Sequence, residues 1–241
     1  MARFARRPST KSIAEPEEVG VASWRSWRSW RLGSLALKGL VAATVLLGAS
    51  ANEGLAKAPP VVTLLGDSIT AGYGLPAGAA LPAQLQIALT KLGVSATVRG
   101  AGVSGDTTAD GLARADFSVQ ADTAVCVVAL GGNDLLQGLD PKTTRANLTA
   151  IARRLKARRI RTVVAGLAAP RAIGSAYARD YDAVFPAVAR DTGAMLYPDL
   201  LAGVGRMPGL NQADGIHPNA AGVKIIAARL APVVARALKT P

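Results

Sequence analysis

The chain is short of the side chains that most enzymes use to bind metals. Its 241 residues include a single histidine, His217, and a single cysteine, Cys126. One cysteine excludes an intrachain disulfide, and one histidine with one cysteine cannot supply the three or four ligands of a usual zinc site. We therefore expect no zinc chemistry, and the mechanism considered below calls for no other metal and no organic cofactor. Any mechanism that needs an imidazole base within one chain must use His217.

Glutamate and tryptophan are nearly confined to the start of the chain. All three tryptophans (Trp24, Trp27 and Trp30) and all glutamates except Glu53 lie within residues 1–51. Carboxylate chemistry in the rest of the protein must therefore use aspartate.

The positive charge is unevenly distributed as well. The formal net charge is +12, and residues 1–51, with eight Lys or Arg and three Glu, contribute +5 of it, which leaves +7 for the rest. An apolar run over residues 39–51 follows this basic region and ends in Ala-Ser-Ala. These features predict a secretory signal over residues 1–51, because thirteen apolar residues are fewer than the roughly 20 that span a bilayer; an uncleaved signal anchor is the alternative. We expect a linker over residues 52–59 and an exported domain, periplasmic or secreted, over residues 60–241.

Short apolar runs alternate with helical patterns along this domain. The run at residues 61–65 is apolar, β-branched and stopped by a glycine, as expected of a buried parallel strand. Strands that alternate with helices predict a parallel sheet covered on both faces. We therefore predict one three-layer α/β/α domain with five strands in the flavodoxin-like order 2-1-3-4-5. The predicted strands are residues 61–65, 96–99, 124–130, 162–165 and 195–197, and the predicted helices are 82–92, 143–157, 176–191 and 220–238.

Ligand sites of open parallel sheets collect at the carboxyl ends of the strands, and the segments after three predicted strands are unusual. The sequence is GDSITAGYG at residues 66–74, GAGVSGDT at 100–107 and GGND at 131–134, and DGIHPN at 214–219 carries the only histidine. Glycine-rich turns alone are common, and neither dinucleotide nor phosphate-loop patterns occur. The joint occurrence of all four segments favours a catalytic site.

These four segments resemble the diagnostic blocks of the GDSL, or SGNH, hydrolase family. The sequences around these segments are similar to those of an exported bacterial branch of the family. Members of this branch act as thioesterases, lysophospholipases and arylesterases. The resemblance implies that Ser68 is the nucleophile, His217 the general base and Asp214 its orienting acid. It also implies that Ser68, Gly105 and Asn133 supply the oxyanion-hole donors.

Elementary chemistry agrees with these roles. A serine hydroxyl needs a base to take its proton, and His217 is the only imidazole available. That base needs an acceptor on its other ring nitrogen, and Asp214 stands three residues earlier on the same short segment. If the first strand lies between the second and third, Ser68 lies between the segments that carry Gly105 and Asn133.

We predict hydrolysis of carboxylic esters through an acyl-enzyme on Ser68. The expected substrates are aryl esters, short-to-medium acyl esters, acyl thioesters and lysophospholipids. Tyr73, Leu135 and Leu136 are the candidate walls of an apolar cleft. We expect a monomer.

Two alternatives stay open. Related SGNH enzymes remove acetyl groups from sugars, so a carbohydrate O-acetylesterase is the first. The second is a non-catalytic module that binds lipid or an anionic surface through the basic segment at residues 153–161. A solvated helix end whose cations complement the helix dipole also explains this segment. Export argues against nucleic acid as a partner, whereas weak contact with an anionic membrane fits the charge.

Overall fold

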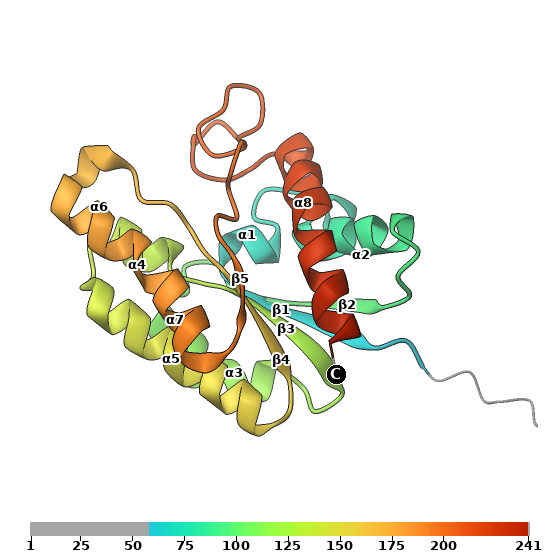
Figure 1. Ribbon diagram of the computed structural model, residues 1–241. Coiled ribbons are helices and arrows are strands. Elements are labelled where there is room, and N and C mark those ends of the chain that lie inside the picture. The colour runs from blue at the N-terminus through green and yellow to red at the C-terminus, as the bar shows by residue number, and fades with distance from the viewer. Residues whose placement is uncertain (1–57, 241) are drawn as a thin grey trace, which may run out of the picture. The chain divides into compact units, whose positions relative to one another are not determined.

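The computed structural model describes residues 58–240, so the predicted signal and most of the predicted linker lie outside the described residues. Five parallel strands form one sheet in the order β2-β1-β3-β4-β5 (Figure 1). The predicted α/β class and strand order are therefore confirmed. The strands are β1 (Val61–Gly66), β2 (Thr97–Gly102), β3 (Thr123–Ala129), β4 (Arg161–Ala165) and β5 (Met195–Tyr197).

Helices cover both faces of the sheet. One layer contains α2 and α8, which pack together, and the opposite layer contains α3, α5 and α7 (Figure 1). The helices are α1 (Ser68–Ala71), α2 (Leu81–Lys91), α3 (Thr108–Ser118), α4 (Gly132–Leu136), α5 (Pro141–Ala157), α6 (Ser175–Asp182), α7 (Val184–Thr192) and α8 (Ala220–Lys239). None of the helices in residues 58–240 is both long and apolar enough to cross a membrane.

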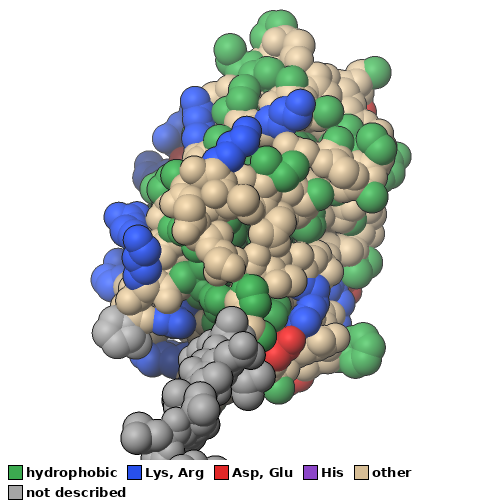
Figure 2. Space-filling view, turned by 90° about the vertical axis from the view of Figure 1, so that its right-hand side faces the viewer, with side chains coloured by type: hydrophobic (Ala, Val, Ile, Leu, Met, Phe, Trp, Pro, Cys, Tyr) green, Lys and Arg blue, Asp and Glu red, His purple; other side chains and the backbone are tan. Residues whose placement is uncertain are grey.

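The core follows from the apolar patterns of these elements. Val62, Leu64 and Leu65 of β1 are fully buried because both faces of this strand are covered. On α5 the buried side chains Leu148, Ile151 and Leu155 recur at the helical spacing of three and four residues. Figure 2 shows the surface on the side of α2 and α8, where Lys and Arg side chains gather along one edge.

The helices differ from the sequence-based prediction in several places, since the short helices α1 and α4 were not predicted and two longer segments also differ. Helix α3 was not predicted, because its inward face consists of small or polar residues, Thr108, Gly111 and Ala115, which give no apolar periodicity. A β-carbon at Gly111 would lie 2.2 Å from Leu130 Cδ1, so any other residue here would have to displace the Leu130 side chain. The single helix predicted over residues 176–191 is wrong, since the structure divides it into α6 and α7. Pro186 lies in the first turns of α7, where its ring prevents a continuous helix from forming.

Candidate active site

Ser68 lies at the carboxyl end of the central strand β1, where the chain turns directly into α1. The side chain of Asp67 caps this helix, because its Oδ1 accepts a hydrogen bond of 3.0 Å from the Ile69 N–H. Ser68 is therefore the first helical residue. Its backbone N–H has no hydrogen-bond acceptor within the helix, as is general for the first turn.

Three side chains form a continuous hydrogen-bonded chain at this position. The hydroxyl of Ser68 lies 2.9 Å from Nε2 of His217, and Nδ1 of His217 lies 2.7 Å from Oδ2 of Asp214. The other oxygen of Asp214 accepts the backbone N–H groups of Ile216 and His217, at 2.9 and 3.0 Å.

The state of Asp214 determines which ring nitrogen of His217 carries the proton. Hydrogen bonds from the backbone and ring of His217, and then from the Ile216 N–H, lower the pKa of Asp214 to about 2. Asp214 is therefore an acceptor at neutral pH, so Nδ1 of a neutral His217 donates to it. Nε2 is left to accept the proton of the Ser68 hydroxyl.

Gln212 links the histidine loop to the serine turn, a role that no sequence pattern indicates. Its backbone N–H donates to the His217 carbonyl, and its side-chain amide donates to the Tyr73 carbonyl, both at 2.8 Å. The ring of Tyr73 also packs against the imidazole, with 4.6 Å between the ring centroids. These contacts connect two segments that are far apart in the sequence.

Two further predicted residues border the same cleft as Ser68. Gly105, on the loop after β2, has a φ of +90°, which favours glycine. Asn133, in α4, donates one amide proton to the Asp106 carbonyl at 2.9 Å. Its second amide proton is free to meet a ligand. Within residues 58–240, the backbone N–H groups of Ser68 and Gly105 donate no hydrogen bond to another backbone group.

A buried aspartate holds the segment that carries Asn133. Asp134 is fully buried and accepts hydrogen bonds from the backbone N–H and hydroxyl of Thr108, and from the hydroxyl of Thr144. These bonds join α4 to the start of α3 and to α5. Asp134 thus fixes the position of Asn133 and does not itself border the cleft.

Arg114 connects the serine turn with the glycine loop. From α3 its guanidinium donates to the carbonyls of Gly66 and Ala101, both at 2.8 Å, and to the Asp106 carboxylate at 2.5 Å. The Gly66 carbonyl immediately precedes the Asp67-Ser68 turn, and Asp106 follows Gly105. One largely buried side chain therefore sets the distance between two candidate oxyanion donors.

We expect Arg114→Ala to lower kcat by about 10- to 100-fold, because small displacements of reacting groups have effects of this size. KM should change much less, and added guanidinium ion should restore part of kcat. The control is Arg99→Ala, since Arg99 forms a two-fold ion pair with Asp122 on the surface at 2.8 Å. Equal losses in the two variants would contradict a positioning role for Arg114.

Asp67 is a carboxyl group with an unusual proton affinity. It is only 4% exposed, and burial raises its pKa to about 6, although the Ile69 N–H and the nearby His217 oppose this shift. The folded protein therefore binds this proton more tightly than the unfolded chain does, so folding is favoured at low pH. That contribution is lost as the pH rises from about 4 to about 6.

This shift predicts the pH dependence of stability. Relative to Asp67→Asn, the wild-type free energy of unfolding should fall by about 2 kcal/mol between pH 4 and pH 7. Asparagine caps a helix as well as aspartate does, so the cap is retained. Urea unfolding at a series of pH values measures this difference. Asp140→Asn, at the exposed cap of α5, is the control for the same substitution at another helix cap.

The cleft itself has a volume of about 620 Å³ and extends over the carboxyl end of the sheet. Tyr73, Leu135 and Leu136, the predicted walls, all border it, and Tyr73 and Leu136 are more than half exposed. Leu201, Arg206 and Ile216 also border it, and so do Leu167, Ala168, Ala169 and Pro170, which no sequence pattern indicated. Those at 167–170 follow β4, so the rule that sites lie at strand ends also covers them.

Comparisons with known proteins identify the family of the chain. A model of the GDSL-like lipase/acylhydrolase family matches residues 64–225. Esterase TesA of Pseudomonas aeruginosa is 36% identical over 186 residues, which cover 77% of this chain and 89% of that protein. Thioesterase 1/protease 1/lysophospholipase L1 of Escherichia coli K12 is 35% identical over 165 residues, 68% of this chain and 78% of that protein.

Solved structures give the same result. The crystal structure of TesA superposes with a TM-score of 0.70 at 34% identity and covers 74% of this chain and 99% of its own. The SGNH-hydrolase esterase AlinE4 has a TM-score of 0.63 at 42% identity, with 75% of this chain and 97% of its own covered. The chain belongs to the GDSL-like lipase/acylhydrolase family.

Proposed function

We propose that this protein is a serine esterase and thioesterase that uses Ser68, His217 and Asp214. The observation that carries the proposal is the hydrogen-bonded chain from the Ser68 hydroxyl through His217 to Asp214, with distances of 2.9 and 2.7 Å. This arrangement activates a hydroxyl as a nucleophile.

The reaction proceeds in two halves. Oγ of Ser68 attacks the carbonyl carbon while Nε2 of His217 takes the hydroxyl proton, and the imidazolium is stabilised by Asp214. His217 then gives this proton to the departing alcohol or thiol, which leaves an acyl-Ser68 ester. Water, deprotonated by His217, attacks that ester and releases the carboxylic acid and the free serine.

The oxyanion of each tetrahedral intermediate would be bound by three donors. These are the backbone N–H groups of Ser68 and Gly105 and the side-chain amide of Asn133. Support comes from their shared position on the cleft, from the N–H groups without a backbone acceptor, and from the free amide proton of Asn133. A neutral amide does not compete with His217 as a base.

We propose that the acyl chain of the substrate lies along Tyr73, Leu135 and Leu136. The border of the cleft is largely apolar, and relatives are named as an esterase, a thioesterase/lysophospholipase and an arylesterase. The proposed substrates are therefore aryl esters, short-to-medium acyl esters, acyl thioesters and lysophospholipids.

A series of p-nitrophenyl esters from acetate to dodecanoate tests the acyl site. Burial of a methylene contributes about 0.8 kcal/mol, so kcat/KM should rise by up to about fourfold per methylene until the cleft is filled. Replacing Leu136 with serine should reduce this slope, whereas Phe117→Ser, at an exposed position on α3 outside the cleft, should not. An optimum at acetate would favour the carbohydrate O-acetylesterase instead.

The test of the nucleophile is labelling with an organophosphonate, followed by peptide mass mapping. The expected result is one phosphonyl group on Ser68 and complete loss of activity. Full activity without label on Ser68 would refute the proposed mechanism. A protein that neither reacts nor hydrolyses any ester would instead support the non-catalytic binding module.

We also propose that the protein is exported as a monomer after removal of residues 1–51. The proposed export rests on the basic and apolar pattern of that segment and on its Ala-Ser-Ala end. N-terminal sequencing of the mature protein tests it. The positive charge of the mature chain predicts weak, salt-sensitive binding to anionic liposomes, and binding that is insensitive to salt would contradict this.

A further inference from the structure

Large hydrophobic side chains gather on the surface around the opening of the cleft. Nine are exposed in the part of the chain that the structure describes, and six of these lie on segments that follow the strands at the carboxyl edge of the sheet. We call these six the apolar rim: Tyr73, Val103, Leu136, Ile173, Met207 and Ile216. A group of exposed apolar side chains beside a cleft is typical of an interaction surface, whereas isolated ones are not.

The rim lies at the opening of the cleft. Tyr73, Leu136 and Ile216 border the cleft themselves, and Val103 and Met207 are each next in sequence to a residue that does. Because all five strands are parallel, the segments that follow them share one edge of the sheet. The loop before α8 projects away from the sheet at this edge (Figure 1), and Figure 2 shows hydrophobic side chains on the same upper tip.

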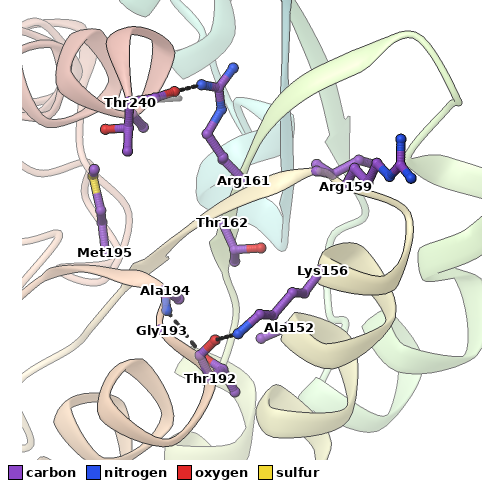
Figure 3. A pocket seen from close by; sticks show the side chains of 12 residues that line it. Ala152, Lys156, Arg159, Arg161, Thr162, Thr192, Gly193, Ala194, Met195 and Thr240 are labelled. Atoms are coloured by element: carbon purple, nitrogen blue, oxygen red, sulfur yellow. Dashed lines mark hydrogen bonds between the residues drawn. The ribbon is translucent and has the colours of Figure 1, made fainter.

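The opposite edge of the sheet has a different character. A second cavity of about 500 Å³ lies there, at the amino ends of β4 and β5 (Figure 3), and none of the nine exposed large hydrophobic side chains borders it. Its cations Lys156 and Arg161 already donate to the backbone carbonyls of Thr192 and Thr240. Exposed apolar side chains therefore accompany the catalytic cleft and not the second cavity.

A cation without a carboxylate partner accompanies the rim. Arg206 borders the cleft directly before Met207, is exposed, and forms no ion pair with any carboxylate of residues 58–240. Its backbone has a φ of +62°, a conformation in which glycine would be less strained. Backbone strain of this kind persists mainly at functional sites.

The segments that carry the rim and Arg206 are almost free of carboxylates. Residues 68–105, 135–139, 166–178 and 200–213 include neither Asp nor Glu. Of the carboxylates beside them, Asp214 is bonded to His217, and Asp199 accepts the Leu201 N–H at 3.0 Å. An anionic group at Arg206 would therefore meet a free positive charge and little repulsion, so this surface favours a partner that is apolar and carries phosphate.

A lipid layer fits these properties better than a protein does. The rim side chains come from separate segments around an opening, and a rigid partner that covered them would also close the cleft. A lipid layer covers the same side chains and can still pass an acyl chain into the cleft. Apolar groups would enter the acyl region while Arg206 stays at the level of the phosphates, as is usual for proteins that lie on a membrane.

We propose that the apolar rim docks the protein on the surface of a phospholipid bilayer or micelle, with Arg206 bound to lipid phosphate. The acyl chain of a lysophospholipid then enters the cleft from that surface. This inference rests on the proposed esterase function for its substrate. Docking itself involves no covalent step and can be measured without turnover.

A fluorescent label at single positions tests the docking. Cys126 is fully buried, and burial raises the pKa of its thiol to about 12, so a cysteine introduced at the surface is the one that reacts. The label is nitrobenzoxadiazole, attached in the full chain that carries Ser68→Ala. It is placed on the rim through Met207→Cys or Ile173→Cys, and outside the rim through Phe117→Cys, whose native side chain is 89% exposed.

Vesicles of phosphatidylcholine that contain lysophosphatidylcholine should shift the emission of the two rim labels to shorter wavelength and protect them from quenching by iodide. The label at position 117 should keep its emission and its quenching. Protection of all three labels, or of none, would overturn the proposal. Protection that appears without vesicles and grows with protein concentration would also overturn it, in favour of a second copy of this chain.

Turnover separates docking from chemistry. Met207→Ser and Ile173→Ser change side chains that do not border the cleft, so hydrolysis of dissolved p-nitrophenyl acetate should be unchanged. Each should raise KM for lysophosphatidylcholine in vesicles by about fivefold, because roughly half of a side-chain burial is lost, whereas Phe117→Ser should not. Arg206→Gln should raise this KM by a similar factor.

An unchanged KM for the vesicle substrate in the double variant Met207→Ser/Ile173→Ser would refute docking by the rim. A wild-type protein that hydrolyses no ester would refute the proposed function, and the labelling experiment would still decide whether the rim docks on lipid.

Discussion

Replacing His217 with alanine should lower kcat for p-nitrophenyl butyrate by at least about 10⁴-fold. Losses of this order are measured when the base of a serine triad is removed. No other imidazole exists in the chain to take over, because His217 is the only histidine. Phosphonylation of Ser68 should slow in parallel, because it needs the same deprotonated hydroxyl.

A double variant that combines His217→Ala with Ser68→Ala shows whether the two residues act in one mechanism or independently. Residues that act as a unit give non-additive losses, so His217→Ala/Ser68→Ala should be no less active than either single variant. Asp214→Asn should be less harmful than His217→Ala but still reduce kcat strongly. Retention of more than a tenth of wild-type kcat by His217→Ala would rule out its role as the base.

Asn133→Ala should lower kcat by about 10²- to 10³-fold, which is typical of the loss of one oxyanion-hole donor. KM should change little, because the charge on the oxygen develops only in the transition state. A boronic acid, which forms a tetrahedral adduct with the serine, should lose affinity by a comparable factor.

Two further variants test whether the loss of kcat is due to the side-chain amide of Asn133. Asn133→Asp keeps the shape of the side chain but replaces the donor with a negative charge, so it should be at least as inactive as Asn133→Ala. Gln137→Ala, at the exposed end of the same helix α4, should retain full activity. Unchanged kcat in Asn133→Ala would remove this residue from the oxyanion hole.

The sequence was sufficient to predict the sheet and that the candidate residues lie at the carboxyl ends of its strands. Buried parallel strands are continuous apolar runs, so β1 and β3 are visible without any structure. Ser68, Gly105 and Asn133 could be located because each follows a strand of the sheet. Asp214 and His217 could be paired because they are close in the sequence.

Residues that act through distant contacts could not be predicted in the same way. Arg114 and Gln212 matter because of carbonyl groups that approach them only in the folded chain, and a carbonyl carries no sequence signal. The high pKa of Asp67 likewise depends on burial by segments remote in sequence. Helix α3 was missed for a related reason, because its close packing uses glycine and alanine instead of large apolar residues.

The basic segment at residues 153–161 illustrates the limit of charge patterns. A solvated helix end accounts for many of its cations, and Arg154, for example, is about half exposed beside Asp116. The exposed Lys156 and the half-buried Arg161 also border the second cavity, at the amino ends of β4 and β5. Which cations do so depends on the path of the chain after α5, which composition does not reveal.

The 149 positions that separate Ser68 from His217 along the chain bear on how activity returns after denaturation. Closing so long a loop has a high entropic cost, and the contact requires β1 and the start of α8 to be in place together. Helices can form locally in microseconds, well before these ends meet. During refolding, recovery of esterase activity should therefore lag behind recovery of the helical circular-dichroism signal. The return of activity then indicates that the whole domain has folded.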